Sequence, residues 1–216
     1  MKKRILVFGD SNAWGFIPGI GTRYEKDSRW PGVLSGLLPD SIEIIEDCIS
    51  GRTTVFDDPC DGLRNGKSAL GYVLNAHAPL DMVILNLGVN DLKFTNAAGS
   101  ARGLEELIRL TKNADHFFPL PGVAQHFPET KELLVISPVL LHPRISELFP
   151  ESELASQYEE SKRLSLCYRS ICRLNGVHFM DAAESASPSV IDCIHMDAAA
   201  HKVLGAAVAA KISEYI

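Results

Sequence analysis

Five short apolar runs, rich in β-branched residues, constrain the fold of this chain more than any other feature of its sequence. Nearly continuous apolar character is typical of strands that are covered on both faces, as in a parallel sheet. We therefore expect five strands in a parallel sheet. The runs cover residues 4–8, 42–46, 82–87, 133–136 and 177–180.

Apolar residues recur with helical spacing between these runs. Strands that alternate with helices imply right-handed βαβ crossovers. The pattern predicts an α/β fold, a three-layer sandwich with helices on both faces of the sheet. The helical stretches are 30–38, 104–110, 154–171 and 203–216.

The length of the chain predicts one domain, 1–216. The chain has 216 residues, and α/β folds of about 200–250 residues commonly form a single unit. Two proline-rich stretches, 117–128 and 142–150, interrupt the regular pattern. We expect both to be surface loops that can contribute walls to a pocket.

Composition argues against several classes of partner. The formal net charge is -6, whereas binding to nucleic-acid phosphates needs a basic face. No apolar stretch approaches the roughly 18 residues that span a bilayer, and the first run is too short for a secretory signal. The five cysteines form no Cys-x-x-Cys pair, which fits free thiols in a reducing compartment. We expect a cytoplasmic protein with no nucleic-acid or membrane partner.

Small polar clusters containing glycine follow the first three apolar runs. They lie at residues 9–11, 50–54 and 88–91. Asp192 and His195 form a fourth polar pair, between the last run and the last helix. Ligands of open parallel sheets bind at the edge where the carboxyl ends of the strands meet. We therefore expect all four clusters to lie together.

These clusters contain the groups that acyl transfer requires. A serine such as Ser11 needs an adjacent base to become a nucleophile, and His195 is that base. Asp192 lies three residues earlier and can orient the imidazole, as in a Ser-His-Asp triad. The backbone N–H groups of Ser11 and Gly51, with the side-chain amide of Asn90, can stabilise an oxyanion.

The same motifs resemble those of the SGNH (GDSL) hydrolase superfamily over essentially the whole chain. The similar motifs are FGDSNAWG near the N-terminus, SGRTT, DDP, LNLGVND, and Asp-x-x-His before the last helix. They are most similar to its bacterial arylesterase and acyltransferase branch. The resemblance implies a flavodoxin-like five-stranded sheet, no cofactor and no metal. It also implies a homo-oligomer whose subunits narrow the site entrance.

The resemblance also implies roles for individual residues. Ser11 is the nucleophile, His195 the base and Asp192 its orienting partner. Gly51 and Asn90 are oxyanion donors, together with the backbone amide of Ser11. The implied activity is hydrolysis of small acyl or aryl esters, and we expect alcohols to compete with water for the acyl group.

Two departures from the family pattern stand next to these residues. Family members often carry Leu-Thr or Leu-Ser after the nucleophile, whereas this chain has Asn12 and Ala13. The hydroxyl at position 13, with any hydrogen bond it makes, is thus missing. Cys193 occupies a position where glycine is common, and we expect it to be a small buried residue.

Several neighbouring residues have more than one interpretation. Asp10 is expected to pin the turn before the nucleophile, and Asp91 to cap the following segment; catalytic support is the alternative for both, as it is for Asn12. Trp14 and Phe16 are equally consistent with core positions and with a pocket wall. Two further residues have one expected role each: Arg52 is a solvated or paired loop charge, and His201 a packing residue.

The sequence leaves the substrate open. Carbohydrate acetylesterases, thioesterases and lysophospholipases share the same catalytic residues. A non-catalytic binder of nucleotides or another ligand on a flavodoxin-like fold is the alternative of another class. Against it, the loop after the first run lacks the G-x-G-x-x-G and G-x-x-x-x-G-K-[ST] patterns, and Asp10 would repel phosphate. A serine esterase acting on a small-molecule ester is therefore the favoured interpretation.

Overall fold

The computed structural model describes residues 2–114 and 132–215 and contains the expected parallel sheet. The strand order is β2-β1-β3-β4-β5, and every pairing is parallel. Each predicted apolar run corresponds to one strand, with bounds that differ by at most two residues at either end. The strands are β1 (Lys3–Gly9), β2 (Ile42–Cys48), β3 (Met82–Asn86), β4 (Glu132–Ser137) and β5 (His178–Asp181).

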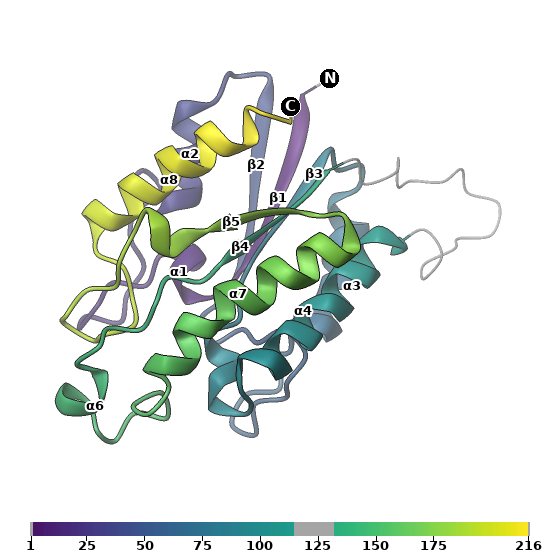
Figure 1. Ribbon diagram of the computed structural model, residues 1–216. Coiled ribbons are helices and arrows are strands. Elements are labelled where there is room, and N and C mark those ends of the chain that lie inside the picture. The colour runs from purple at the N-terminus through teal and green to yellow at the C-terminus, as the bar shows by residue number, and fades with distance from the viewer. Residues whose placement is uncertain (1, 115–131, 216) are drawn as a thin grey trace.

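Helices cover both faces of this sheet, so the predicted three-layer α/β sandwich is confirmed (Figure 1). One layer contains α2 (Trp30–Leu37) and α8 (Ala198–Ile212), which pack on each other. The other contains α3 (Gly66–His77), α4 (Ala97–Lys112) and α7 (Tyr158–Asn175).

Three of these helices begin at a polar residue whose side chain accepts a backbone N–H of the first turn. Asn65 accepts from Ser68 before α3, and Asn96 accepts from Gly99 before α4. Asp197 accepts from the N–H of Ala200 before α8. Such caps satisfy donors that a helix leaves unpaired at its start. The sequence analysis did not predict α3, although Asn65 marks its start.

The alternation of side chains along β1 divides the core between the two helical layers. Ile5 and Val7 belong to the cluster under α2 and α8, whereas Leu6 and Phe8 belong to the cluster under α3, α4 and α7. All four side chains are fully buried. A central strand that is apolar on both faces is thus fixed in register by two cores at once.

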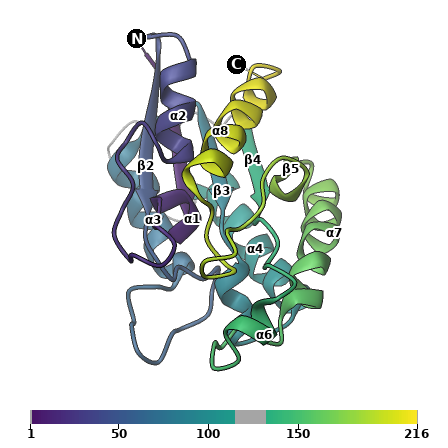
Figure 2. The ribbon, with the colours of Figure 1, turned by 90° about the vertical axis from the view of Figure 1, so that its left-hand side faces the viewer.

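The connections that follow the strands gather at one end of the molecule, away from both termini (Figure 2). They include two short helices, α1 (Ser11–Trp14) and α6 (Ile145–Leu148), the loop before α8, and two 3-10 turns, η1 (Val89–Lys93) and η2 (Ala182–Glu184). The proline-rich stretch 142–150 contains α6, whereas the stretch 117–128 lies outside the described residues.

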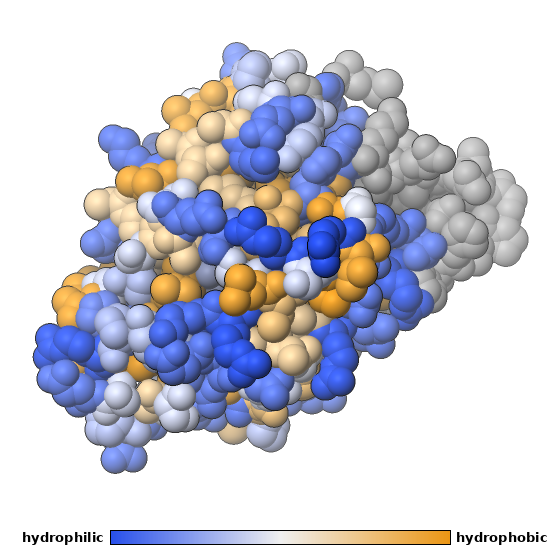
Figure 3. All heavy atoms as spheres, viewed as in Figure 1, coloured by the Kyte–Doolittle hydropathy of each residue, from blue (hydrophilic) through white to orange (hydrophobic). Residues whose placement is uncertain are grey.

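The outer face of the helices mixes hydrophilic and hydrophobic residues (Figure 3). Leu166 and Leu174 on α7 and Val203 on α8 are exposed. No helix of the described part of the chain combines the length and apolar character of a membrane span.

Candidate active site

The end of β1 presents Ser11 at the rim of the sheet because Gly9 permits a very close approach. A Cβ atom on Gly9 would lie 2.5 Å from Cβ of Ala13 and 2.9 Å from the carbonyl oxygen of Asn86. Asp10 caps α1, since its Oδ1 accepts the N–H of Asn12 at 3.0 Å. The turn therefore depends on glycine for space and on Asp10 for a hydrogen bond.

The structure brings Ser11, Asp192 and His195 together, although Ser11 and His195 are 184 positions apart. His195 Nε2 lies 2.9 Å from Ser11 Oγ, and its Nδ1 lies 2.8 Å from Asp192 Oδ2. The other oxygen of Asp192 accepts the backbone N–H groups of His195 and Ile194 at 2.9 and 3.0 Å. Burial raises the pKa of Asp192, but these bonds and the imidazole outweigh it and the net shift is downward. A carboxylate is thus fixed behind the imidazole.

Asn12 ties the nucleophile turn to the loop that carries His195. Its Nδ2 donates to the carbonyl of Ile194 at 3.3 Å, and its Oδ1 accepts the N–H of Met196 at 3.0 Å. Cys193 in the same loop is fully buried and has a φ of 64°. This left-handed conformation favours glycine and explains why glycine is common there; the expectation of a small buried residue at Cys193 is confirmed.

Gly51 and Asn90 lie on the same cavity as Ser11 and His195. Gly51 has a φ of 81°, and a Cβ atom there would lie 2.6 Å from Arg64 Nε, so only glycine fits without strain. Asn90 lies in η1 and donates from Nδ2 to the carbonyl of Arg52 at 3.2 Å. Two groups of the type expected for an oxyanion site therefore meet beside the serine.

Asp91 does not cap the segment after it, which corrects the expectation from the sequence. Its carboxylate accepts the N–H and Oγ1–H of Thr54 at 2.7 and 2.6 Å and the hydroxyl of Ser100 at 2.7 Å. Gly88 rather than Asp91 precedes η1 as its cap. Burial raises the pKa of Asp91 to about 6 despite these bonds, and burial raises that of Asp10 to about 7. Two buried acids therefore lie behind the oxyanion groups.

The cavity in front of Ser11 has a volume of about 230 Å³ and two kinds of wall. Phe16, Leu154 and Ile194 are apolar, whereas Arg64, Lys93, Ser152 and Glu153 are polar. Lys93 Nζ lies 3.6 Å from Glu153 Oε2. The polar wall thus offers both hydrogen-bond donors and acceptors to a ligand.

Phe16 occupies the wall next to the base. Its ring stacks on His195 with a centroid separation of 4.1 Å and an interplanar angle of 27°. Trp14 is only partly buried: it packs against the cluster under α2 and α8 and is not among the residues that line this cavity, which is closer to the core position than to the pocket wall. Arg23 covers the Trp14 ring and donates to its carbonyl oxygen.

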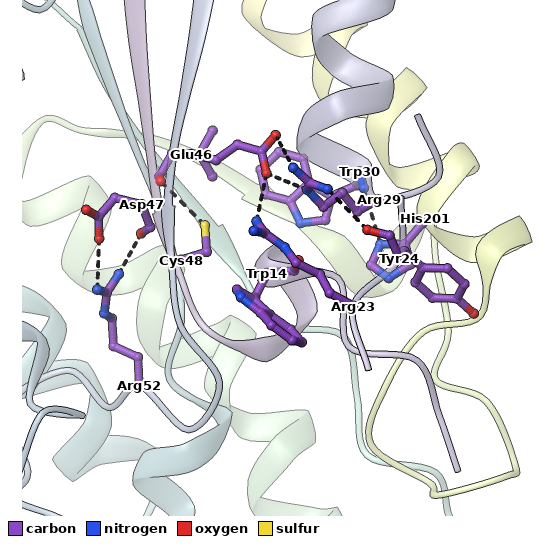
Figure 4. A network of polar contacts seen from close by, with 11 residues as sticks. Trp14, Arg23, Tyr24, Arg29, Trp30, Glu46, Asp47, Cys48, Arg52 and His201 are labelled. Atoms are coloured by element: carbon purple, nitrogen blue, oxygen red, sulfur yellow. Dashed lines mark hydrogen bonds and ion pairs between the residues drawn. The ribbon is translucent and has the colours of Figure 1, made fainter. Parts of the chain in front are cut away.

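Glu46 holds the loop that carries Phe16. It accepts Arg29 Nε and Nη2 at 2.6 and 3.1 Å and Arg23 Nη2 at 3.2 Å. Arg23 pairs across a β-bridge with Phe16. Figure 4 shows this carboxylate between the two guanidinium groups, while the next residue of β2, Asp47, points to the opposite side.

Several residues around the cavity escaped the sequence analysis. Lys93 and the segment 152–154 line it, but neither follows a strand directly; Arg64 also lines it and lies in the loop 60–65, which the sequence does indicate as a wall of the pocket. Arg52 was expected to be either a solvated or a paired loop charge. It is paired with Asp47, and its side chain is only 3% exposed. His201 is a buried packing residue, as expected, and accepts the N–H of Trp30; burial lowers its pKa to about 4.

The arrangement has the chemistry of nucleophilic acyl transfer. A hydroxyl, a base and an orienting carboxylate form one hydrogen-bonded chain, and amide donors share the cavity. Within residues 2–114 and 132–215, no group of three or more His, Cys, Asp or Glu side chains is placed to hold a metal ion.

Comparisons with known proteins agree with this geometry. The sequence model of the GDSL-like lipase/acylhydrolase family matches residues 7–203. A search of curated proteins finds no match.

Solved structures similar to this chain include three esterases. Est24, a carbohydrate acetylesterase from Sinorhizobium meliloti, is 34% identical with a TM-score of 0.91, and the match covers 100% of both chains. The aryl esterase of M. smegmatis is 34% identical with a TM-score of 0.86, covering 99% of this chain and 100% of that one. Another carbohydrate acetylesterase family member from Sinorhizobium meliloti is 30% identical with a TM-score of 0.85, covering 98% of each chain.

Proposed function

Because this chain belongs to the GDSL-like lipase/acylhydrolase family, we propose that it is a serine esterase that cleaves small acyl or aryl esters through an acyl-enzyme. The observation that carries the proposal is the chain of contacts from Asp192 through His195 to Ser11, with distances of 2.8 and 2.9 Å. Ser11 and His195 line a cavity, and the oxyanion donors Gly51 and Asn90 line the same cavity.

Acylation begins at Ser11. Its Oγ attacks the carbonyl carbon of the ester while its proton passes to His195 Nε2. Asp192 keeps Nδ1 protonated and directed toward itself, so that Nε2 is the free acceptor. The negative oxygen of the tetrahedral intermediate is held by the N–H groups of Ser11 and Gly51 and by the Asn90 amide. Collapse breaks the ester bond, and the leaving alcohol takes the proton from His195.

Deacylation repeats these steps with water. His195 takes a proton from water as the water oxygen attacks the acyl carbon, and the second intermediate expels Ser11 Oγ, which recovers the proton. An alcohol in place of water yields a new ester, so acyl transfer competes with hydrolysis. Adding ethanol to the reaction in water and measuring the ethyl ester by gas chromatography tests this branch.

The size of the cavity supports small substrates. Its volume of about 230 Å³ lies below the roughly 300–1,000 Å³ of pockets that hold drug-sized ligands. The first experiment compares wild type and Ser11→Ala on p-nitrophenyl esters from acetyl to decanoyl. We expect the mutant to lose turnover and the wild type to prefer short chains. A long-chain preference would shift the assignment toward lipid or thioester substrates, and full activity of Ser11→Ala would refute the mechanism.

A carbohydrate acetylesterase is the second candidate, and the polar wall favours it. Arg64 and Lys93 can donate to sugar hydroxyls, while Glu153 can accept from them. The similarity to Est24, described as a carbohydrate acetylesterase, also supports this assignment. Measuring kcat/KM for acetylated xylose and for phenyl acetate, in the wild type and in Lys93→Met, distinguishes the candidates. For a carbohydrate acetylesterase, Lys93→Met should lower kcat/KM for acetylated xylose but not for phenyl acetate.

The proposal extends to the setting of the enzyme. The free cysteines, Cys48, Cys60, Cys167, Cys172 and Cys193, support residence in a reducing cytoplasm. Apolar side chains exposed on α7 and α8 support self-association into a homo-oligomer. Light scattering after gel filtration measures the mass of the particle; a monomer at every concentration would contradict self-association.

A further inference from the structure

Arg52 follows Gly51 directly, and its guanidinium is buried where two strands end (Figure 4). Nη1 donates to the carbonyl oxygens of Asp47 and Gly9 at 2.6 and 3.3 Å. Nη2 donates to Asp47 Oδ1 at 2.8 Å. The guanidinium carbon also lies 3.9 Å from the centroid of the Phe8 ring. One rigid side chain therefore contacts the ends of both β1 and β2.

Burying a guanidinium is costly unless the group is paired and hydrogen-bonded. Arg52 meets this condition at its two terminal nitrogens, with one carboxylate and two backbone carbonyls, whereas its buried Nε has no hydrogen-bond partner among the described residues. The planar fork of arginine spans several acceptors at once, which the single ammonium of lysine cannot do. The contacts suit a group that fixes backbone positions.

The carbonyl of Gly9 fixes both ends of the short segment that contains Gly51. It accepts the N–H of Ile49 at 3.2 Å and Nη1 of Arg52 at 3.3 Å. The chain between these contacts turns at Gly51, whose φ is 81°. Gly9 itself lies two residues before Ser11. The two hydrogen bonds to Gly9 thus hold the Gly51 amide in a fixed position relative to β1, the strand that precedes Ser11.

The backbone of Arg52 also orients Asn90. Its carbonyl oxygen accepts Asn90 Nδ2 at 3.2 Å. An amide nitrogen has two N–H donors, so this bond sets the rotation of the Asn90 side chain and leaves the second donor for the cavity. A shift of residue 52 would move both oxyanion donors, the one before it in the chain and the one bonded to it.

We propose that Arg52 is a positioning residue that preorganises the oxyanion site by fixing the Gly51 turn and the Asn90 amide relative to Ser11. The inference rests on the proposed esterase function. Arg52 does not touch the substrate, and it acts through the two donors.

A double-mutant cycle between Arg52 and Asn90 tests this role, with p-nitrophenyl acetate as substrate. Loss of one oxyanion donor costs about 100- to 1,000-fold in kcat, so we expect Arg52→Met to lower kcat about 10- to 100-fold. KM should change by less than about threefold, because ground-state binding is unaffected. In the Asn90→Ala background, the loss of kcat caused by Arg52→Met should be at least about threefold smaller than in the wild type, because the part that acts through Asn90 is absent and only the part that acts through Gly51 remains.

Arg29→Met is the matched control. Arg29 is another poorly exposed arginine paired with a carboxylate of β2, Glu46, but it lies across the strands from Arg52 (Figure 4). Its effect on kcat should be the same factor in both backgrounds. Equal factors for Arg52→Met in the two backgrounds would show a merely structural role and overturn the proposal.

Urea unfolding of every variant separates folding from catalysis. Should Arg52→Met not fold, Arg52→Lys takes its place, with an expected loss of about 3- to 10-fold in kcat that is again smaller in the Asn90→Ala background. The Ser11→Ala variant keeps the two proposals distinct. If it retains activity, the esterase mechanism fails; if it is inactive while the cycle is additive, only the role of Arg52 fails.

Discussion

The two sides of the cavity differ in how deeply their residues are buried and in which polar contacts hold them. On the oxyanion side, residues 50–54 and 88–91, the side chains of Thr53, Thr54 and Asp91 are fully buried. On the loop side, residues 16–24 and 152–154, Ile20 is 69% exposed and Glu153 is exposed as well. The oxyanion side is held by buried hydrogen bonds, and the loop side by ion pairs in which one partner is exposed, Arg23 with Glu46 and Glu153 with Lys93.

This difference separates the rate of the reaction from the choice of substrate. Electrostatic stabilisation requires donors that are fixed before the reaction begins, and buried, satisfied polar networks are rigid. Exposed loops tolerate substitution and shape specificity. We therefore expect changes on the oxyanion side to affect all esters equally, and changes on the loop side to affect some esters more than others.

Asn90→Ala should give the largest effect on the oxyanion side. Removing one donor is expected to lower kcat about 100- to 1,000-fold, by the same factor for acetyl and butyryl esters and with little change in KM. Steady-state kinetics on p-nitrophenyl esters measure this, with Asn75→Ala on the exposed face of α3 as control. A loss that depends on the acyl chain would mean that Asn90 reads the substrate.

Phe16→Leu should give a smaller effect that depends on the ester. Aromatic contacts contribute about 0.5–1.5 kcal/mol beyond their buried area, so the ratio of kcat/KM for phenyl acetate over ethyl acetate should fall about 3- to 10-fold. Phe179→Leu, in β5, is the control. An equal loss of kcat/KM for both esters would mean that Phe16 acts by positioning His195 and not by contacting the substrate.

The fold could be predicted because apolar patterning acts locally and repeatedly. β1 and β3 are buried on both faces, so their runs are almost purely apolar. β2 is an edge strand that is only partly buried over most of its length, which permits the two acids Glu46 and Asp47 near its end. The helix α3 was not predicted, because two glycines and several polar residues weaken its apolar pattern.

The residues proposed to be catalytic could be brought together from the sequence because parallel strands have their carboxyl ends at one edge of the sheet. Their supporting contacts could not. Asp91 bonds to Thr54, 37 positions away, and Arg52 reaches Gly9, 43 positions away. Such partners depend on how two loops fold over each other, and no local pattern encodes this. The position of Trp14 could not be predicted for the same reason. Aromatic residues often line pockets, but this one packs, partly buried, against the cluster under α2 and α8.

Asp10→Asn should change the pH dependence of stability rather than turnover, and it tests whether water reaches the buried acids of the oxyanion side. Burial raises the pKa of Asp10 to about 7 from an ordinary value of 3.8. The folded protein therefore holds a proton that the unfolded chain releases. The resulting stability is complete below about pH 4 and is lost as the pH rises toward 7, at about 1 kcal/mol per pH unit.

Asn at position 10 can still accept the N–H of Asn12 but does not titrate, so the variant should lack this loss. Urea unfolding between pH 4 and 8 measures the difference in unfolding free energy between Asp10→Asn and wild type. The difference should move in favour of the variant up to about pH 7 and then level off, while Glu153→Gln on the loop side should show no such trend. Asp91 and Arg52, which interact electrostatically with Asp10, are present in all three proteins. Parallel curves for Asp10→Asn and wild type would mean that water reaches Asp10, and the contrast between a dry oxyanion side and a solvated loop side would fail at that residue.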